Sequence, residues 1–256
     1  MTEPRPIYTR VGHTGAEELR FYGKRVFAEL LGRTTTTQML VLGIAGRMLS
    51  PDEAALVDDV ITAMSSADPR LWPFKLTRLA SAHGNATYGV AATILASQGA
   101  IFGPTRFEAI ANVLVDLHAR APKDDELEAI LRGGAVGFGI LYGRYDVRYD
   151  QLASALERRG HDGSFTRISR QAVHVARTRL TVEPHVFVAI AAVCLDLGMT
   201  PAEIAVFGML PLFHDALANA AEGARHASPE LQCLPGRVVQ YVGPPPRASE
   251  RATRNQ

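Results

Sequence analysis

The chain has 256 residues, a formal net charge of +1, a mean hydropathy of +0.02 and 47% hydrophobic residues. This length allows one large domain or two modest ones, each with a buried core. The near balance of charge excludes a general attraction to nucleic acid or to a membrane surface. A small anionic ligand stays open, because it needs only a local cluster of cations.

The cysteines give no sign of a disulfide framework or a metal site. The two cysteines, Cys194 and Cys233, are too few for a disulfide framework, and they lack the spacing of metal ligands. No run of about 18 apolar residues is free of charges, and the start MTEPRPIYTR has no signal-peptide core. We therefore expect a cytoplasmic protein with reduced thiols, no metal and no membrane partner.

The N-terminal segment predicts a short exposed hairpin. IYTRV and ELRFY mix β-forming and charged residues on either side of a turn at Gly12 to Gly15. A helix over residues 16–31 is the alternative.

Three helix starts carry capping signals. Thr34 to Thr37 can cap a helix that ends by Arg47. Ser50-Pro51-Asp52-Glu53 combines a cap, a proline for the first helical position and a glutamate that closes a capping box. Thr200-Pro201-Ala202-Glu203 repeats this signal and opens a helical region up to about Ala224.

The middle of the chain is also helical in pattern. Residues 88–97 are small and apolar all round, which predicts a buried helix. After a break at 99–104, one helical face carries Phe107, Ile110, Leu114 and Leu117. Further helices are predicted over 149–159, 164–180 and 186–197, the last one buried, and a short strand over 237–242.

Helical patterns dominate, and the sequence shows no strand–helix alternation and no GxxxxGK loop. We therefore predict an all-α fold and disfavour an α/β nucleotide-binding fold. Gly133 to Gly139 holds four glycines in seven residues, which is typical of a hinge or of backbone that approaches a ligand closely.

The candidate polar residues are ambiguous when taken singly. His83 and His118 stand 35 residues apart on an apolar background, and each could be a structural histidine. Arg148 could bind an anion or simply pair with Asp146. A basic stripe could receive phosphates, although a solvated face explains it better. This stripe consists of Arg167, Arg170, His174 and Arg177.

Several short motifs occur in the order found in the citrate synthase superfamily. HGNATYG at 83–89 resembles the H-G-P-A-V-S-G of citryl-CoA lyases and of the lyase end of ATP-citrate lyases. SQGA at 97–100, LHARA at 117–121, GFG at 137–139, DVR at 146–148 and PHVF at 184–187 match S-x-G-A, L-H-G-G-A, G-F-G, D-P-R and P-N-V-D. The resemblance covers about residues 35 to 242.

This resemblance implies a large domain of residues 1–120 and 200–256, a small domain of 121–199, domain closure over the substrate and a homodimer. His83 would hold a substrate carboxylate, His118 would polarise a thioester carbonyl, and Arg148 would bind a carboxylate. The substrate-binding set is completed by Gly137, Gly139 and Tyr142. No tightly bound cofactor is implied, and coenzyme A enters as part of the substrate.

The chain departs from the family at its acid–base residues. Ile140 stands where a second histidine is expected and Phe187 where the aspartate is expected, while Thr93 and Leu212 stand where arginines are expected. Because such acid–base groups are worth ~10² to 10⁴-fold each, we expect no ordinary citrate synthesis. If the alignment with the family motifs is shifted slightly, a polar side chain takes the place of a missing acid–base residue. The candidates are Tyr142, His185 and His214.

Three hypotheses follow. The first is a lyase or acyltransferase that makes or, preferably, cleaves a carbon–carbon bond of an acyl-CoA or related carbonyl substrate other than citrate. Cleavage generates an enolate without removing a methyl proton, and His118 would stabilise its oxygen. The second is a non-catalytic binding or partner subunit. The third and lowest is a citryl-CoA lyase.

Overall fold

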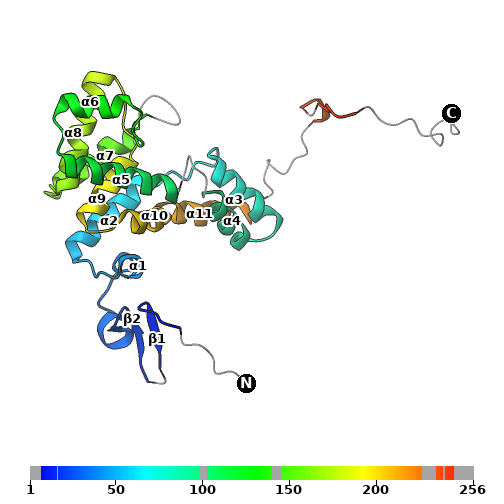
Figure 1. Cartoon of the computed structure of the whole chain (residues 1–256). Helices are drawn as coiled ribbons and strands as arrows, with labels where there is room; N and C mark the ends of the chain where they lie inside the picture. The colour runs from blue at the N-terminus through cyan, green and yellow to red at the C-terminus, as the bar shows by residue number, and fades with distance from the viewer. Residues whose placement is uncertain are drawn as a thin grey trace, which may run out of the picture.

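The computed structural model describes residues 7–15, 17–97, 103–139, 146–226, 235–238 and 240–244. As predicted, the described chain is mainly helical with a small N-terminal sheet (Figure 1). The α-helices are α1 Thr36–Ala45, α2 Pro51–Met64, α3 Trp72–His83, α4 Ala86–Ala96, α5 Pro104–Arg120, α6 Asp124–Arg132, α7 Val147–Arg158, α8 Ser164–Val175, α9 Phe187–Asp196, α10 Pro201–Phe207 and α11 Leu210–Gly223. Shorter turns are η1 Val26–Leu30, η2 Ala176–Leu180 and η4 Gly236–Val238.

The N-terminal hairpin is confirmed, but its turn lies further along the chain than predicted. The strands are β1 Gly12–Thr14, β2 Leu19–Phe21 and β3 Lys24–Arg25, paired antiparallel in that order. Gly15 N–H donates to the Glu18 carbonyl at 2.9 Å, so the chain reverses after β1. Most of the predicted turn, Gly12 to Gly15, is therefore the strand β1. A helix over 16–31 is wrong except for the single turn η1, because β2 and β3 pair there.

The three capping signals begin helices as predicted. Thr35, Ser50 and Thr200 accept hydrogen bonds from the backbone N–H three residues on, at 3.2, 3.2 and 3.3 Å. In each case the side chain at that third position returns a bond to the cap backbone. Each box satisfies two backbone donors that the first helical turn leaves open.

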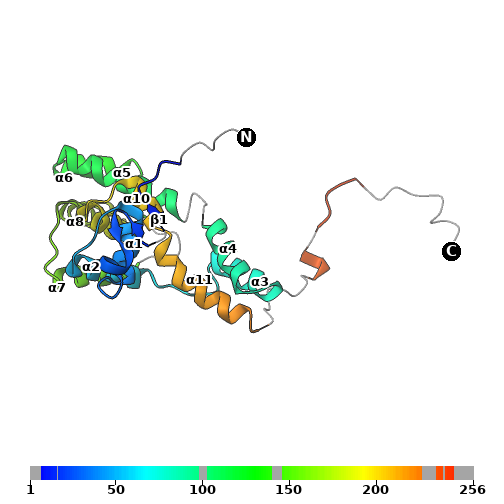
Figure 2. The same ribbon diagram turned by 90° about the horizontal axis from the view of Figure 1, so that it is seen from below.

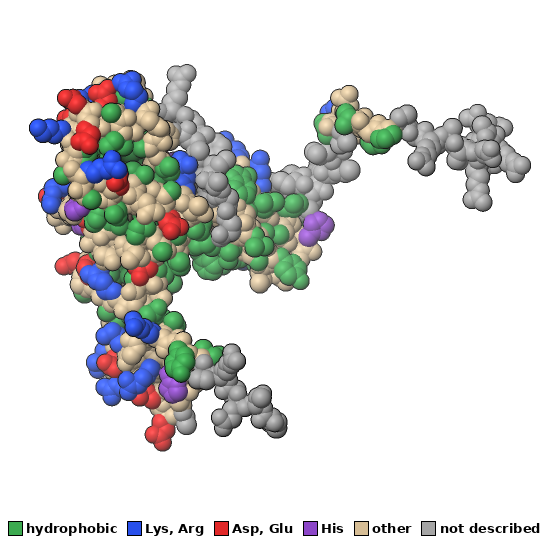
Figure 3. All heavy atoms as spheres, viewed as in Figure 1, with side chains coloured by type: hydrophobic (Ala, Val, Ile, Leu, Met, Phe, Trp, Pro, Cys, Tyr) green, Lys and Arg blue, Asp and Glu red, His purple; other side chains and the backbone are tan. Residues whose placement is uncertain are grey.

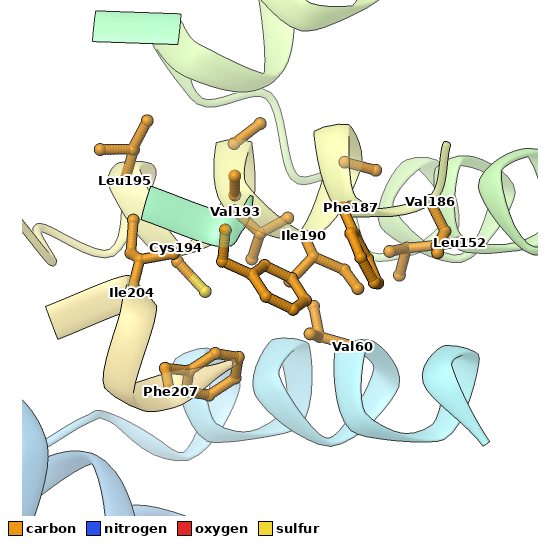
Figure 4. Close-up of a cluster of buried hydrophobic side chains, with 14 of the residues drawn as sticks. Val60, Leu152, Val186, Phe187, Ile190, Val193, Cys194, Leu195, Ile204 and Phe207 are labelled. Atoms are coloured by element: carbon orange, nitrogen blue, oxygen red, sulfur yellow. The ribbon is translucent and has the colours of Figure 1, made fainter. Parts of the chain in front are cut away.

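The body of the molecule is built around α9. Every residue from Phe187 to Leu195 is buried, so the predicted buried helix is confirmed. Val60 of α2, Leu152 of α7, and Ile204 and Phe207 of α10 pack around it (Figure 4). A smaller cluster joins the end of α5 to α6 and α8. The division at residues 120 and 200 stays a prediction.

Helices α3, α4 and α11 form an arm that projects from the body in both ribbon views (Figures 1 and 2). The arm buries small and hydroxyl side chains, among them Thr77, Ser81 and Thr93. Hydrophobic side chains gather on the lower part of the arm in the face that Figure 3 shows. Here the prediction that α4 is buried all round is wrong, because Tyr88 is 60% and Leu95 75% exposed.

The C-terminal predictions meet two further corrections. The helical region after Thr200 divides at Gly208, where a Cβ would overlap the ring of Phe107. The described part of 237–242 contains no strand, and η4 lies at its start. By length and composition alone, Pro201–Gly223 could cross a membrane, with a mean hydropathy of 1.4, although half of that stretch is buried in the protein.

Candidate active site

Two helix starts meet at one carboxylate, that of Asp146. Asp146 is the N-cap of α7, and its Oδ1 accepts the Arg148 N–H at 3.2 Å. Its Oδ2 accepts the Val186 N–H at the start of α9, at 3.1 Å. The first turn of α5 lies near the start of α9, since the Phe107 and Phe187 rings are 4.2 Å apart. Helix N-termini carry partial positive charge, which favours an anion here.

Arg148 completes the environment of Asp146. Its guanidinium donates from Nε at 2.8 Å and from Nη2 at 2.9 Å, a bidentate pair. Burial alone would raise the pKa of the Asp146 carboxyl, but hydrogen bonds from Arg148 and Val186 outweigh it and hold the pKa below its usual value. Asp146 therefore stays ionised, and Arg148 stays anchored at the start of α7.

His185 is a buried and neutral member of the same cluster. Its backbone N–H donates to the Gly137 carbonyl at 2.9 Å, and its Nδ1 accepts the Phe187 N–H at 3.3 Å. The ring proton is therefore assigned to Nε2, 3.9 Å from Asp146 Oδ2. Burial, aided by the charges of Arg148 and Arg106, lowers the pKa of His185 to about 4 against the pull of Asp146.

Arg106 lies in the first turn of α5, where its N–H donates to the Gly103 carbonyl at 3.1 Å. Its Nε is buried and has no hydrogen-bond partner among the described residues. Its charge acts on His185 together with that of Arg148. The charges of Arg106 and Arg148 thus both act on the neutral imidazole of His185, and only Arg148 pairs with Asp146. The cluster has an excess of positive charge suited to a bound carboxylate.

The predicted glycines hold backbone against the start of α9. Gly137 has φ 98°, and a Cβ there would press on Val188 and Ile110. Gly139 has φ 93° and donates its N–H to the Glu183 carbonyl at 2.8 Å. Only glycine adopts such angles freely. The structure therefore brings Gly137, Gly139 and Arg148 together, while Tyr142 and Ile140 lie outside the described residues.

His83 is placed well away from this group within one chain. It is the exposed last residue of α3, a helix that starts at Trp72, which packs on the body core. The 12 residues of α3 span about 18 Å, so His83 lies at the tip of the arm.

His118 is likewise distant, in the last turn of α5. It is exposed, and its ring stacks on Phe165 at 4.5 Å. Along the helix it lies about 16 Å beyond Phe107, which faces Phe187. Within one chain the structure does not bring His83, His118 and Arg148 to one site, and the roles of the two histidines stay predictions.

Three of the positions that depart from the family pattern are described by the structure: Phe187, Thr93 and Leu212. Phe187 is fully buried, with its ring 4.0 Å from that of His185. Thr93 and Leu212 line one small pocket between α4 and α11. His214, the remaining register candidate, contacts Ser65 and Asp215 at 2.6 and 3.1 Å, between α11 and the segment after α2.

The other polar groups favour the structural interpretation. In the basic stripe, Arg167 and Arg170 contact Asp162, and Arg177 pairs with Asp150 and Glu183. Among the described residues, no group of three or more His, Cys, Asp or Glu side chains could hold a metal ion. Sequence reasoning missed Arg106, whose available signal was a cation in the first turn after the Gly103-Pro104 helix start.

No family model and no curated protein matches the sequence. Solved structures match the fold over nearly the whole chain. Citryl-CoA lyase from Hydrogenobacter thermophilus superposes with a TM-score of 0.80 at 19% identity, over 98% of this chain and 100% of that one.

Two further matches come from larger proteins. ATP citrate lyase from Methanosaeta concilii, solved in complex with (3S)-citryl-CoA, has a TM-score of 0.76 at 15% identity, over 100% of this chain and 44% of that one. Citrate synthase from Thermotoga maritima has a TM-score of 0.63 at 15% identity, over 87% and 62%. The chain has the fold of the citrate synthase superfamily.

Proposed function

We propose that the protein is a lyase that cleaves a carbon–carbon bond beside the carbonyl of an anionic acyl thioester, or of a related carbonyl compound, other than citrate. The observation that carries this proposal is the cluster in which Arg148 and two helix starts surround Asp146 and the charge of Arg106 acts on the adjacent His185. Such an arrangement favours a substrate carboxylate and an oxygen that gains negative charge. Coenzyme A would arrive as part of the substrate.

The chemistry fits bond cleavage better than bond formation. In cleavage of a β-hydroxy acyl thioester, the carbinol proton passes to a water molecule, the carbinol carbon becomes a carbonyl, and the electron pair of the broken bond forms the thioester enolate. A β-keto acyl thioester first adds water at its β-carbonyl, and the hydrate then cleaves in the same way to a carboxylic acid and the enolate. The enolate is then protonated by solvent. No carboxylate base is needed to remove a methyl proton, which agrees with a buried Phe187 beside the cluster.

His185 is a positioning residue in this proposal. Its Nδ1 is already occupied by the Phe187 N–H, and its backbone holds Gly137. It therefore fixes the start of α9 relative to the glycine backbone and keeps a neutral ring beside Asp146.

A non-catalytic binding or partner subunit is the second candidate. Phe187 favours it, because a fully buried ring packed against Phe107 leaves no polar side chain at that position. The two candidates share carboxylate binding and differ in turnover. Citryl-CoA lyase activity ranks third.

The test offers purified protein citryl-CoA and, separately, a panel of β-hydroxy and β-keto acyl-CoAs, with release of the shorter acyl-CoA as the readout. Arg106→Gln should lower kcat/KM on the true substrate by ~10-fold or more, since it removes a charged hydrogen-bond partner. Arg120→Gln is the matched control, because Arg120 pairs with Asp116 on an exposed face at the other end of α5. Binding without turnover across the whole panel would select the second candidate.

A homodimer is the proposed assembly, and the arm supports it. Leu76, Tyr88, Leu95, Phe213 and Leu217 are exposed on α3, α4 and α11, and α4 contains no charged residue. A continuous apolar surface of this kind is normally covered by a partner. Light scattering should give a dimer that Leu95→Glu dissociates. A monomer in which lipid vesicles protect the arm would instead indicate a membrane surface.

A further inference from the structure

A small pocket lies between α4 and α11, outside the charged cluster. It is lined by Thr93, Ile94, Ser97, Met209, Leu212 and Phe213, with no charged side chain among them. The space open to the centre of a water-sized sphere is about 10 Å³, close to that of one such sphere. The pocket therefore fits a methyl-sized group. An ionised carboxylate would lose its hydration there without gaining an opposite charge.

One polar group in the pocket lining is buried without a hydrogen-bond partner among the described residues. Ser97 is 2% exposed, and its Oγ has no hydrogen-bond partner in the part of the chain that the structure describes. By contrast, the Thr93 hydroxyl donates to the Gly89 carbonyl at 3.1 Å and also contacts the Thr77 hydroxyl. A buried hydroxyl without a partner is costly, and an oxygen atom of a ligand would satisfy it.

The pocket adjoins the start of α5, where Arg106 lies. Gly103, the cap of α5, contacts Ser97 so closely that a Cβ on Gly103 would overlap the Ser97 carbonyl. Gly208, next to the lining residue Met209, packs in the same way against Phe107. The apolar pocket thus adjoins the helix start that carries Arg106.

We infer that this pocket selects the substrate, by taking a methyl-sized alkyl substituent of the molecule whose carboxylate binds at Arg106 and Arg148. Ser97 Oγ donates a hydrogen bond to a hydroxyl or carbonyl oxygen beside that substituent. This inference rests on the proposed function and narrows its substrate class. The substrate is a β-hydroxy or β-keto acyl thioester with one carboxylate and a short alkyl branch, where citrate has a further carboxymethyl group.

The decisive measurement is binding, which needs no turnover. Calorimetric titration compares 2-hydroxy-2-methylbutanedioate with the same acid lacking the methyl group and with citrate. The methyl compound should bind roughly 4- to 10-fold more tightly than the unbranched acid, the effect of one buried methyl. Citrate should bind more weakly than either. Equal affinity for all three acids would overturn the inference.

Variants assign the effect to this pocket. Leu212→Ala should remove the preference for methyl and favour an ethyl or propyl branch, and Leu212→Val should do so partly with less effect on folding. Ser97→Ala should weaken binding of the methyl compound by ~10-fold, the effect of one buried hydrogen bond. The matched control is Leu40→Ala, at an exposed position of α1 outside the arm.

Turnover and binding separate the two proposals. If Leu212→Ala abolishes the preference for the methyl compound but no acyl-CoA is cleaved, the pocket inference holds and the lyase proposal is refuted. If acyl-CoAs are cleaved but neither Leu212→Ala nor Leu212→Val changes the preference for a branch, the lyase proposal holds and the pocket inference is refuted.

Discussion

The body around α9 and the arm of α3, α4 and α11 distribute apolar side chains in opposite ways. In the body, α9 is buried over Phe187 to Leu195 and surrounded by aliphatic and aromatic side chains. In the arm, hydroxyl groups and glycine lie inside while Tyr88, Leu95 and Phe213 face outward. The difference shows that the body buries its apolar side chains within one chain, whereas the arm leaves several of them exposed, which is the surface we propose for the dimer.

The largest expected effect is a loss of unfolding free energy from a core substitution in the body. Phe207→Ala removes a fully buried ring from the core and should cost about 3–5 kcal/mol of unfolding free energy. Urea denaturation measures the loss. Phe213→Ala, on the outer face of the arm, should have little effect in the isolated chain and a growing effect as protein concentration rises. Equal losses at every concentration would contradict the comparison.

A pH effect of similar size tests the cluster that contains Asp146, Arg148 and His185. The pKa of His185 falls from 6.5 to about 4 on folding, so the unfolded chain binds the proton more readily. Stability should therefore be full above pH 6.5 and fall by about 3 kcal/mol as the pH drops to 4. His185→Gln should flatten this part of the urea-midpoint profile, and His174→Gln, on the exposed side of α8, should not.

A smaller loss is expected from overfilling the arm. A Cβ on Gly89 would overlap the Ser81 hydroxyl and press on the Thr77 carbonyl, so Gly89→Ala should cost about 1–3 kcal/mol. Thermal unfolding measures it against Ala91→Ser, on the exposed side of α4. An unchanged melting temperature for Gly89→Ala would show that the three helices pack more loosely than described.

The smallest effect should come from an exposed ion pair. Arg120→Gln removes the partner of Asp116, and both side chains are more than half exposed. Solvent screens such pairs strongly, so we expect no measurable change in the melting temperature. A clear loss would show that the end of α5 is covered in solution.

The sequence predicted local structure where the signal is itself local. The boxes at Ser50 and Thr200 place their helix starts correctly, because cap, proline and glutamate act within four residues. The burial of α4 was predicted wrongly for a different reason. Composition shows that an apolar helix needs cover, but not whether that cover comes from the same chain.

The site was predicted less well than the fold. Arg148, Gly137 and Gly139 lie near the turns that place them beside α9, and their role in substrate binding stays a prediction. His118 occupies a motif that fits by spacing, yet spacing along the chain does not say which end of a 17-residue helix faces the cluster. Arg106 has no motif of its own, and its role depends on contacts with segments far away in sequence.

Asp146 ties two helices to one side chain. Its two oxygens receive the first amides of α7 and of α9, so neither helix can shift without stretching a bond to the other. The consequence concerns how such a site can change over time. Substitutions in the neighbouring pockets can alter what is bound while the frame stays fixed, whereas a change at position 146 would release both helices and erase the geometry that any new specificity must use.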